Sequence, residues 1–130
     1  MTMKTILLVD DESAILDALR AVLEDAGYGV VTAGNGAEGL ARLRDSAPDL
    51  VVTDTMMPVL DGIGFVRQMK AQPDYSAIPV IMMSAARGAL PKEDLPKAAS
   101  FFQKPFDLDA LLTTIERLIG AGQPQSAHGE

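Results

Sequence analysis

Short, wholly apolar runs recur along the chain and alternate with longer segments in which apolar residues are three or four positions apart. Runs of the first kind are typical of strands buried in a parallel sheet, and segments of the second kind are typical of amphipathic helices. The alternation predicts an α/β domain of (βα)5 type, a doubly wound parallel five-stranded sheet with right-handed crossovers and helices on both faces. The strands are predicted at Ile6–Val9, Gly29–Thr32, Leu50–Thr53, Ile78–Met83 and Ser100–Gln103.

Capping residues and prolines set the predicted limits of the helices between these strands. Ser13 is expected to cap the first helix, and Asp107 is expected to cap the last one. A second helix is expected over about residues 37–44, and a third lies between residues 62 and 73. The predicted apolar face of the last helix comprises Leu108, Leu111, Leu112, Ile115, Leu118 and Ile119.

The stretch from Arg87 to Lys97 occupies the place of a fourth helix but contains a glycine and two prolines. A proline inside a helix removes a hydrogen bond and collides with the preceding turn, so a short or broken helix is expected there. Residues 120–130 lack large apolar side chains and are expected to form a disordered C-terminal tail. The predicted domain therefore covers residues 1–119, and no second domain is expected after it.

The charge balance and the cysteine content exclude several classes of protein. The 130 residues include 11 Lys and Arg against 18 Asp and Glu, a net charge of −7, which disfavours a general binder of nucleic acid or of acidic membranes. With no cysteine, the chain has no disulfide framework, no thiolate metal site and no cysteine nucleophile. Its apolar runs are far shorter than the roughly 18 residues that a membrane span needs, so a cytoplasmic protein is expected.

Acidic, hydroxyl and basic residues stand at the ends of four predicted strands. Asp10 and Asp11 follow the first strand, Asp54 the third, Ser84 the fourth and Lys104 the fifth. The carboxyl ends of parallel strands open at one edge of a sheet, so these side chains are expected to converge there. Carboxylate oxygens suit Mg²⁺, while an ammonium and a hydroxyl suit phosphoryl oxygens. The joint pattern predicts a phosphoryl-transfer site in which a carboxylate attacks in line.

Four stretches around these residues carry a resemblance to a known family. They are residues 6–12 (ILLVDDE), 50–62 (LVVTDTMMPVLDG), 79–85 (PVIMMSA) and 103–106 (QKPF). On these stretches the chain resembles a response-regulator receiver domain of two-component signalling, over roughly residues 4 to 119. The resemblance implies a flavodoxin-like fold with strand order 2-1-3-4-5. It also implies a stand-alone response regulator that signals to a downstream protein effector by contact.

The resemblance further implies a role for each residue of the constellation. Asp54 is expected to receive a phosphoryl group from a histidine kinase or a histidine phosphotransfer protein. Ser84 and Lys104 are expected to hold the phosphoryl oxygens, and the Lys104–Pro105 peptide bond is expected to be cis. Phe101 is expected either to turn inward as Ser84 moves or to be a core aromatic on an edge strand. The expected Mg²⁺ ligands are Asp11, Asp54 and the backbone carbonyl of Met56, with Asp10 acting through water.

Three features depart from the family's pattern. Lys97-Ala98 stands where the family has Gly-Ala, and the segment expected to form the fourth helix contains two prolines. The family's usual output surface is therefore not expected to be fully kept. Met56 and Ala86 are apolar at the positions two beyond the phosphoacceptor and the hydroxyl residue, where polar side chains could orient a water. The protein is therefore expected to phosphorylate itself with Mg²⁺ and to lose the phosphoryl group slowly. It is not expected to be a metabolic enzyme.

Three alternatives stay open. A haloacid-dehalogenase-like phosphatase also attacks with a strand-terminal aspartate, but it needs a second Asp two residues on, where this chain has Met56. A degenerate receiver could serve as a constitutive docking module, which the loss of an acidic, hydroxyl or lysine position would favour. A flavin-binding domain shares the topology, but Asp10-Asp11-Glu12 after the first strand would repel its phosphate.

Overall fold

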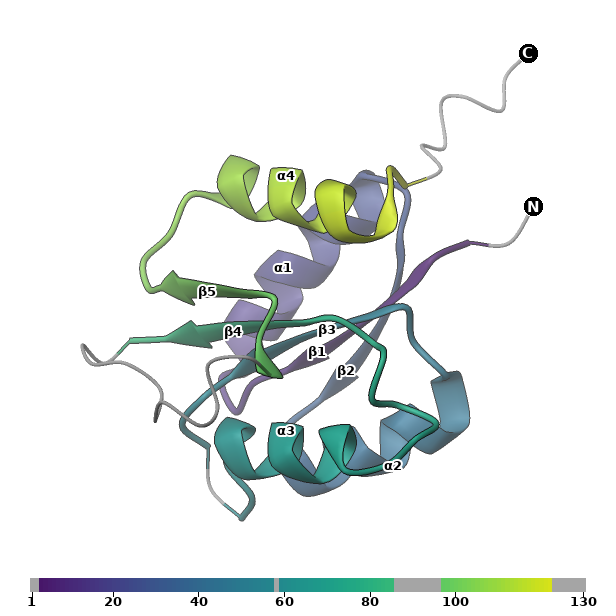
Figure 1. The fold of residues 1–130 in the computed structure, drawn as a ribbon. Coiled ribbons are helices and arrows are strands. Elements are labelled where there is room, and N and C mark those ends of the chain that lie inside the picture. The colour runs from purple at the N-terminus through teal and green to yellow at the C-terminus, as the bar shows by residue number, and fades with distance from the viewer. Residues whose placement is uncertain (1–2, 58, 86–96, 123–130) are drawn as a thin grey trace.

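Five parallel strands form one sheet in the order β2-β1-β3-β4-β5, as the resemblance to receiver domains implies (Figure 1). The computed structural model describes residues 3–57, 59–85 and 97–122. The strands are β1 (Thr5–Val9), β2 (Gly29–Ala33), β3 (Leu50–Asp54), β4 (Val80–Ser84) and β5 (Ser100–Gln103). The helices within the described residues are α1 (Ser13–Asp25), α2 (Gly36–Ser46), α3 (Gly62–Lys70) and α4 (Leu108–Ile119).

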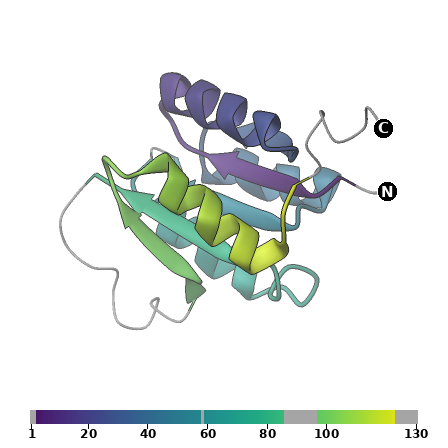
Figure 2. The same ribbon diagram turned by 90° about the horizontal axis from the view of Figure 1, so that it is seen from above.

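Alternate residues of the strands supply two hydrophobic cores, one on each face of the sheet. Ile6 and Leu8 of β1 pack on the face covered by α1 and α4, and Leu7 and Val9 pack on the face covered by α2 and α3. Figure 2 shows α1 and α4 crossing the same face of the sheet. Because β1, β3 and β4 are buried on both faces, each contains a continuous apolar run, at residues 6–9, 50–52 and 80–83. This burial holds the carboxyl ends of the strands at one fixed edge.

The start of α1 differs from its prediction. Glu12, not Ser13, is the N-cap residue, and its side chain makes no capping hydrogen bond. The carbonyl of Glu12 accepts the N–H groups of Ile15 and Leu16, and its own N–H donates to Asp10 Oδ1 at 2.9 Å. The prediction for Ser13 was wrong because the carboxylate of Asp10 fixes the turn one residue earlier than a serine cap requires.

Two other limits also shift. Helix α2 begins at Gly36 and ends at Ser46, because the side chain of Asn35 caps it and Ala47 ends it in the left-handed conformation with φ of 45°. Strand β4 begins at Val80, two residues later than predicted, because Ile78 donates its N–H to a turn carbonyl of Tyr75. The predicted cap of α4 is confirmed, since the side chain of Asp107 accepts the N–H of Asp109.

Leu108, at the start of the predicted apolar face of α4, is more exposed than the residues that follow it on that face. Its residue is 39% exposed because the first turn of α4 borders an open cavity of about 420 Å³, which Ile15 and Phe106 also line. A short or broken helix was predicted from Arg87 to Lys97. All of this segment except Lys97 lies outside the described residues. The predicted tail lies outside them from residue 123 onward. No helix in the described part of the chain is long and apolar enough to cross a membrane.

Candidate functional site

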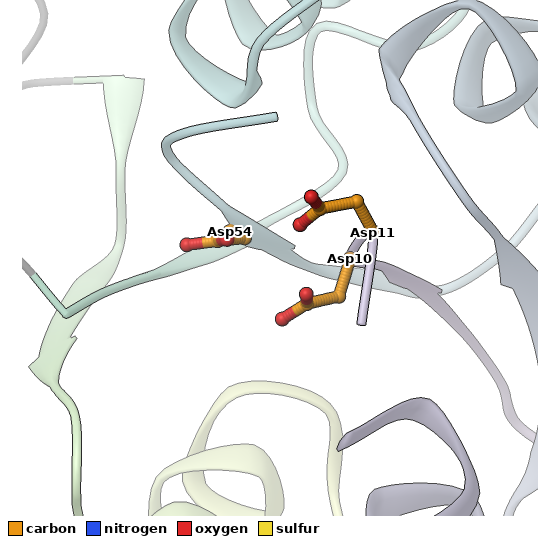
Figure 3. Close-up of side chains that lie close together, drawn as sticks. All are labelled: Asp10, Asp11 and Asp54. Atoms are coloured by element: carbon orange, nitrogen blue, oxygen red, sulfur yellow. The ribbon is translucent and has the colours of Figure 1, made fainter. Parts of the chain in front are cut away.

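Three carboxylates gather where β1 and β3 end. One oxygen from each of Asp10, Asp11 and Asp54 lies within 4.8 Å of the others. The parallel pairing of Val9 with Thr53 sets this arrangement, because it brings the residues after β1 level with Asp54. Figure 3 shows the side chains of Asp10 and Asp11 leaving the chain on opposite sides, with Asp54 beside them. The predicted convergence of these aspartates is therefore found in the structure.

The three carboxylates differ in burial and partners. Asp10 is completely buried, with Oδ1 accepting the N–H of Glu12 at 2.9 Å and Oδ2 accepting from Lys104 Nζ at 2.8 Å. Asp54 is 7% exposed, and its Oδ1 accepts the backbone N–H of Thr55 at 2.9 Å. Asp11 is exposed to solvent. Asp10 and Asp54 are therefore buried, and Asp11 is the carboxylate of the three that is open to solvent.

Lys104 enters the site from the turn after β5. Its Nζ lies 2.8 Å from Asp10 Oδ2, 3.8 Å from Asp54 Oδ2 and 3.8 Å from Glu12 Oε1. Burial alone disfavours the charged ammonium, but the hydrogen bond and charge of Asp10 outweigh it and raise the pKa of Lys104. Its backbone N–H donates to the carbonyl of Ser84 at 2.8 Å, and the Lys104–Pro105 bond is cis, as the resemblance implied. Lys104 therefore stays charged beside Asp54.

The carboxyl group of Asp54 has a raised pKa. Burial is the main cause, because it disfavours the charged form, and the negative charge of Asp10 adds to the effect. The positive charge of Lys104 and the backbone N–H groups of Thr55 and Met56 oppose the shift without cancelling it. Ionised Asp54 is therefore destabilised by its surroundings, and a cation that bound there would relieve the repulsion.

The remaining predicted residues lie around this centre. Ser84 ends β4, is 4% exposed and lies in register with Gln103 of β5. Met56 lies in the loop after β3, and the residue is 65% exposed. Phe101 is paired with Met82 of β4, and the residue is 38% exposed. The roles predicted for these residues in phosphoryl binding, metal binding and switching stay predictions.

The donor set fits Mg²⁺. Carboxylate oxygens are hard ligands, and Mg²⁺ takes one or two of them while keeping several waters. Asp11 is open to solvent, which leaves room for such waters on its side of the group. The fold and the site together define a doubly wound α/β domain with an acidic, lysine-facing pocket at the strand ends.

The chain belongs to the response regulator receiver domain family, whose model matches residues 6–116. The resemblance found in the sequence is therefore confirmed, and the chain is a module of two-component signalling. Receiver domains are phosphoacceptor switches rather than metabolic enzymes, and they work with histidine kinases. The match favours a receiver over the phosphatase and the flavin-binding domain that the sequence left open.

Known relatives include both small and long proteins. Protein PilH of Pseudomonas aeruginosa is 36% identical over 119 residues, which cover 90% of this chain and 98% of PilH. The chemotaxis protein CheY4 of Vibrio cholerae superimposes with a TM-score of 0.80 at 32% identity, covering 90% of this chain and 99% of CheY4. The DNA-binding transcriptional regulator NtrC of Escherichia coli is 36% identical over 126 residues. The match covers 91% of this chain but only 25% of NtrC.

Two features of the site were missed in the sequence. Glu12 donates its backbone N–H to Asp10, and its carboxylate lies near Lys104. Nothing in the sequence distinguishes Glu12 from other acidic residues at the start of a helix. Thr53 donates its hydroxyl to the main-chain carbonyl of Asp54 at 2.9 Å. The role of Thr53 could have been suspected from the sequence, because it is a polar residue that follows the apolar run of a buried strand.

Proposed function

We propose that Asp54 accepts a phosphoryl group from a histidine kinase or a histidine phosphotransfer protein. A carboxylate oxygen of Asp54 attacks the phosphorus in line, a P–O bond forms, and the P–N bond to the donor histidine breaks. The imidazole leaves with its electron pair and takes up a proton from solvent. The observation that carries this proposal is the position of Lys104 Nζ 3.8 Å from Asp54 Oδ2, beside the three gathered carboxylates.

Three features of this chain support the reaction. Lys104 is held in a charged state beside Asp54, so its ammonium can bind an oxygen of the transferring group. The hydroxyl of Ser84 is expected to donate to another of these oxygens, since Ser84 ends the neighbouring strand β4. Asp10 orients Lys104 through its hydrogen bond of 2.8 Å. The site thus offers a nucleophile and donors for the charge that spreads over the phosphoryl oxygens.

We further propose that Mg²⁺ is the cofactor. Asp11, Asp54 and the backbone carbonyl of Met56 would hold it directly, and Asp10 would hold it through water. The carboxylate oxygens within 4.8 Å of one another and the raised pKa of Asp54 support this ligand set. When bound, the ion neutralises the charge of the carboxylates and of the transferring phosphoryl group.

The output is proposed to be protein contact rather than chemistry. Phosphorylation would draw Ser84 toward Asp54, and Phe101, which is 38% exposed, would turn inward. Such a change would alter the surface that a downstream protein effector recognises. We place the protein in the cytoplasm and propose no direct contact of the receiver with nucleic acid or membrane, in keeping with the net charge of −7.

Beryllofluoride, an analogue of the phosphoryl group, tests this function directly. With Mg²⁺ present, wild type should bind it and unfold at a higher temperature, because a ligand that binds the folded state alone stabilises it. Asp54→Asn should show no shift. Asp45→Asn, a change of an exposed helix carboxylate, should behave as wild type. An equal shift in Asp54→Asn would contradict the assignment.

The same analogue identifies partners. A pull-down with and without beryllofluoride should recover a protein effector in one state only, because the two states present different surfaces. Equal recovery in both states would favour the alternative of a constitutive docking module.

A further inference from the structure

Thr53 brings a buried hydroxyl group into an otherwise apolar stretch of the sheet, directly before Asp54. The residue is completely buried, and its neighbours Val51 and Val52 in β3 are buried and apolar. Its Oγ1 donates to the main-chain carbonyl of Asp54 at 2.9 Å. A valine of the same shape would fill this space without a polar atom, so packing alone does not require a hydroxyl here.

A second contact holds the same carbonyl from the start of α3. A Cβ atom at Gly62 would lie 1.8 Å from the Asp54 carbonyl oxygen, so the backbone of Gly62 sits directly against it. The N–H of Gly62 also donates to the carbonyl of Thr55 at 3.0 Å. The Asp54 carbonyl is therefore held between the hydroxyl of Thr53 and the first residue of α3.

Fixing this peptide also fixes the carboxylate of Asp54. The N–H of Thr55 bonds both to Asp54 Oδ1 and to the carbonyl of Met83 on β4, each at 2.9 Å. With Oδ1 held against the backbone, Oδ2 is the oxygen that lies 3.8 Å from Lys104 Nζ. A rotation of the Asp54 peptide would move both oxygens relative to Lys104.

We propose that Thr53 is a positioning residue for phosphoryl acceptance, because its hydroxyl, with Gly62 behind it, fixes the Asp54 peptide and thereby the direction of the attacking carboxylate. The inference rests on the proposed function of Asp54. It assigns Thr53 no contact with the phosphoryl group, and its effect is transmitted through the backbone alone.

The test compares Thr53→Val, which removes the hydroxyl at nearly equal volume, with Thr53→Ser, which retains it. Phosphorylation by acetyl phosphate with Mg²⁺ is followed by mass spectrometry over a range of acetyl phosphate concentrations. In Thr53→Val the maximal rate constant should fall about fivefold, the effect of one typical hydrogen bond, with the half-saturating concentration unchanged. Thr53→Ser should restore the rate to within about twofold of wild type.

A second readout needs neither metal nor phosphodonor. The amide signal of Thr55 in ¹⁵N NMR should shift in Thr53→Val and return toward wild type in Thr53→Ser, since this N–H bonds the Asp54 carboxylate. Urea unfolding gives the folded fraction under assay conditions, so that rates refer to folded protein. Thr53→Ala provides a second hydroxyl-free variant.

The outcomes separate this inference from the proposed function. Equal maximal rates in wild type, Thr53→Val and Thr53→Ala would overturn the role of Thr53, as would a Thr53→Ser variant as slow as Thr53→Val. If wild type itself gained no phosphoryl group at Asp54, the proposed function would fail first. A slow Thr53→Val with a restored Thr53→Ser and a shifted Thr55 signal supports the inference.

Discussion

Lys104 donates a hydrogen bond from Nζ to Asp10 Oδ2 at 2.8 Å, and this pair joins the turn after β5 to the end of β1. Asp10 is completely buried, and the side chain of Lys104 is 13% exposed. Neither charge is well solvated, so each depends on the other. The same ammonium lies 3.8 Å from Asp54 Oδ2, which links the stability of the site to its proposed chemistry.

Replacing Lys104 by methionine is expected to destabilise the fold by about 2 to 4 kcal/mol, because it leaves the charge of Asp10 buried and unpaired. Urea unfolding at pH 7 in EDTA measures the change. The double variant Asp10→Asn with Lys104→Met should recover much of the loss, since it removes both charges. Additive effects of the two substitutions would show that the pair is not coupled.

Replacing Asp54 by asparagine is expected to stabilise the protein in EDTA at pH 7. Burial raises the pKa of Asp54 above its usual value of 3.8, so the ionised form costs the folded state free energy that neutral asparagine does not. The contribution of Asp54 to stability is greatest below pH 3.8 and is lost as the pH rises through the folded-state pKa. The advantage of Asp54→Asn in urea midpoint should therefore be largest at neutral pH and should shrink in acid. A lower midpoint for Asp54→Asn at pH 7 would show that Lys104 outweighs burial.

The positions of the strands and of the site residues could be predicted because each is marked by a short stretch of the sequence. The run from Ile6 to Val9 is apolar at every position, and only strands buried on both faces need this pattern. Once the strands are parallel, Asp10 and Asp54 must meet at the same edge. The strand order came from the resemblance rather than from periodicity, since periodicity does not say which strands are neighbours.

The remaining features depend on contacts between distant residues. Nothing local distinguishes Asp10, which is buried and bound to Lys104, from Asp11, which is exposed. Leu108 fits the apolar face of α4 by spacing, yet its first turn borders an open cavity. Gly62 has the sequence pattern of an ordinary helix start, and it is the fold that brings its backbone against the Asp54 carbonyl.

Replacing Tyr28 by phenylalanine is expected to cost about 1 kcal/mol, because the buried hydroxyl donates to the carbonyl of Gly120 at 2.8 Å and so ties the end of α4 to the start of β2. Urea unfolding measures the cost. Tyr75→Phe is the matched control at a partly buried tyrosine, and it should change stability much less. Equal effects of the two changes would argue against this hydrogen bond.

Alkaline unfolding tests the same contact independently. Burial, with the charge of Glu116 as a second cause, raises the pKa of Tyr28 above 10.0, although a hydrogen bond from the backbone of Gly122 partly opposes the shift. The stability that Tyr28 contributes is therefore complete below pH 10 and is lost as the pH rises through the folded-state pKa. Above pH 10, wild type should lose stability more steeply than Tyr28→Phe. Parallel curves would contradict the raised pKa.

Loss of the phosphoryl group from Asp54 is expected to be slow. Hydrolysis needs a water held in line behind the phosphorus, and the apolar side chains of Met56 and Ala86 cannot orient one. Met56→Asn combined with Ala86→Glu should speed the loss about tenfold or more, as a positioned polar group does in other hydrolyses. Phosphoprotein decay, followed by mass spectrometry after removal of the donor, measures the rate. An unchanged rate would mean that water positioning does not limit hydrolysis.

The most direct test of the central claim is peptide mapping by mass spectrometry after treatment with acetyl phosphate and Mg²⁺. A single phosphoryl group is expected on the peptide that contains Asp54, with no such group in the absence of Mg²⁺ and none in Asp54→Asn. A phosphoryl group on another residue in wild type, or an equal yield in Asp54→Asn, would contradict the claim that Asp54 is the phosphoacceptor.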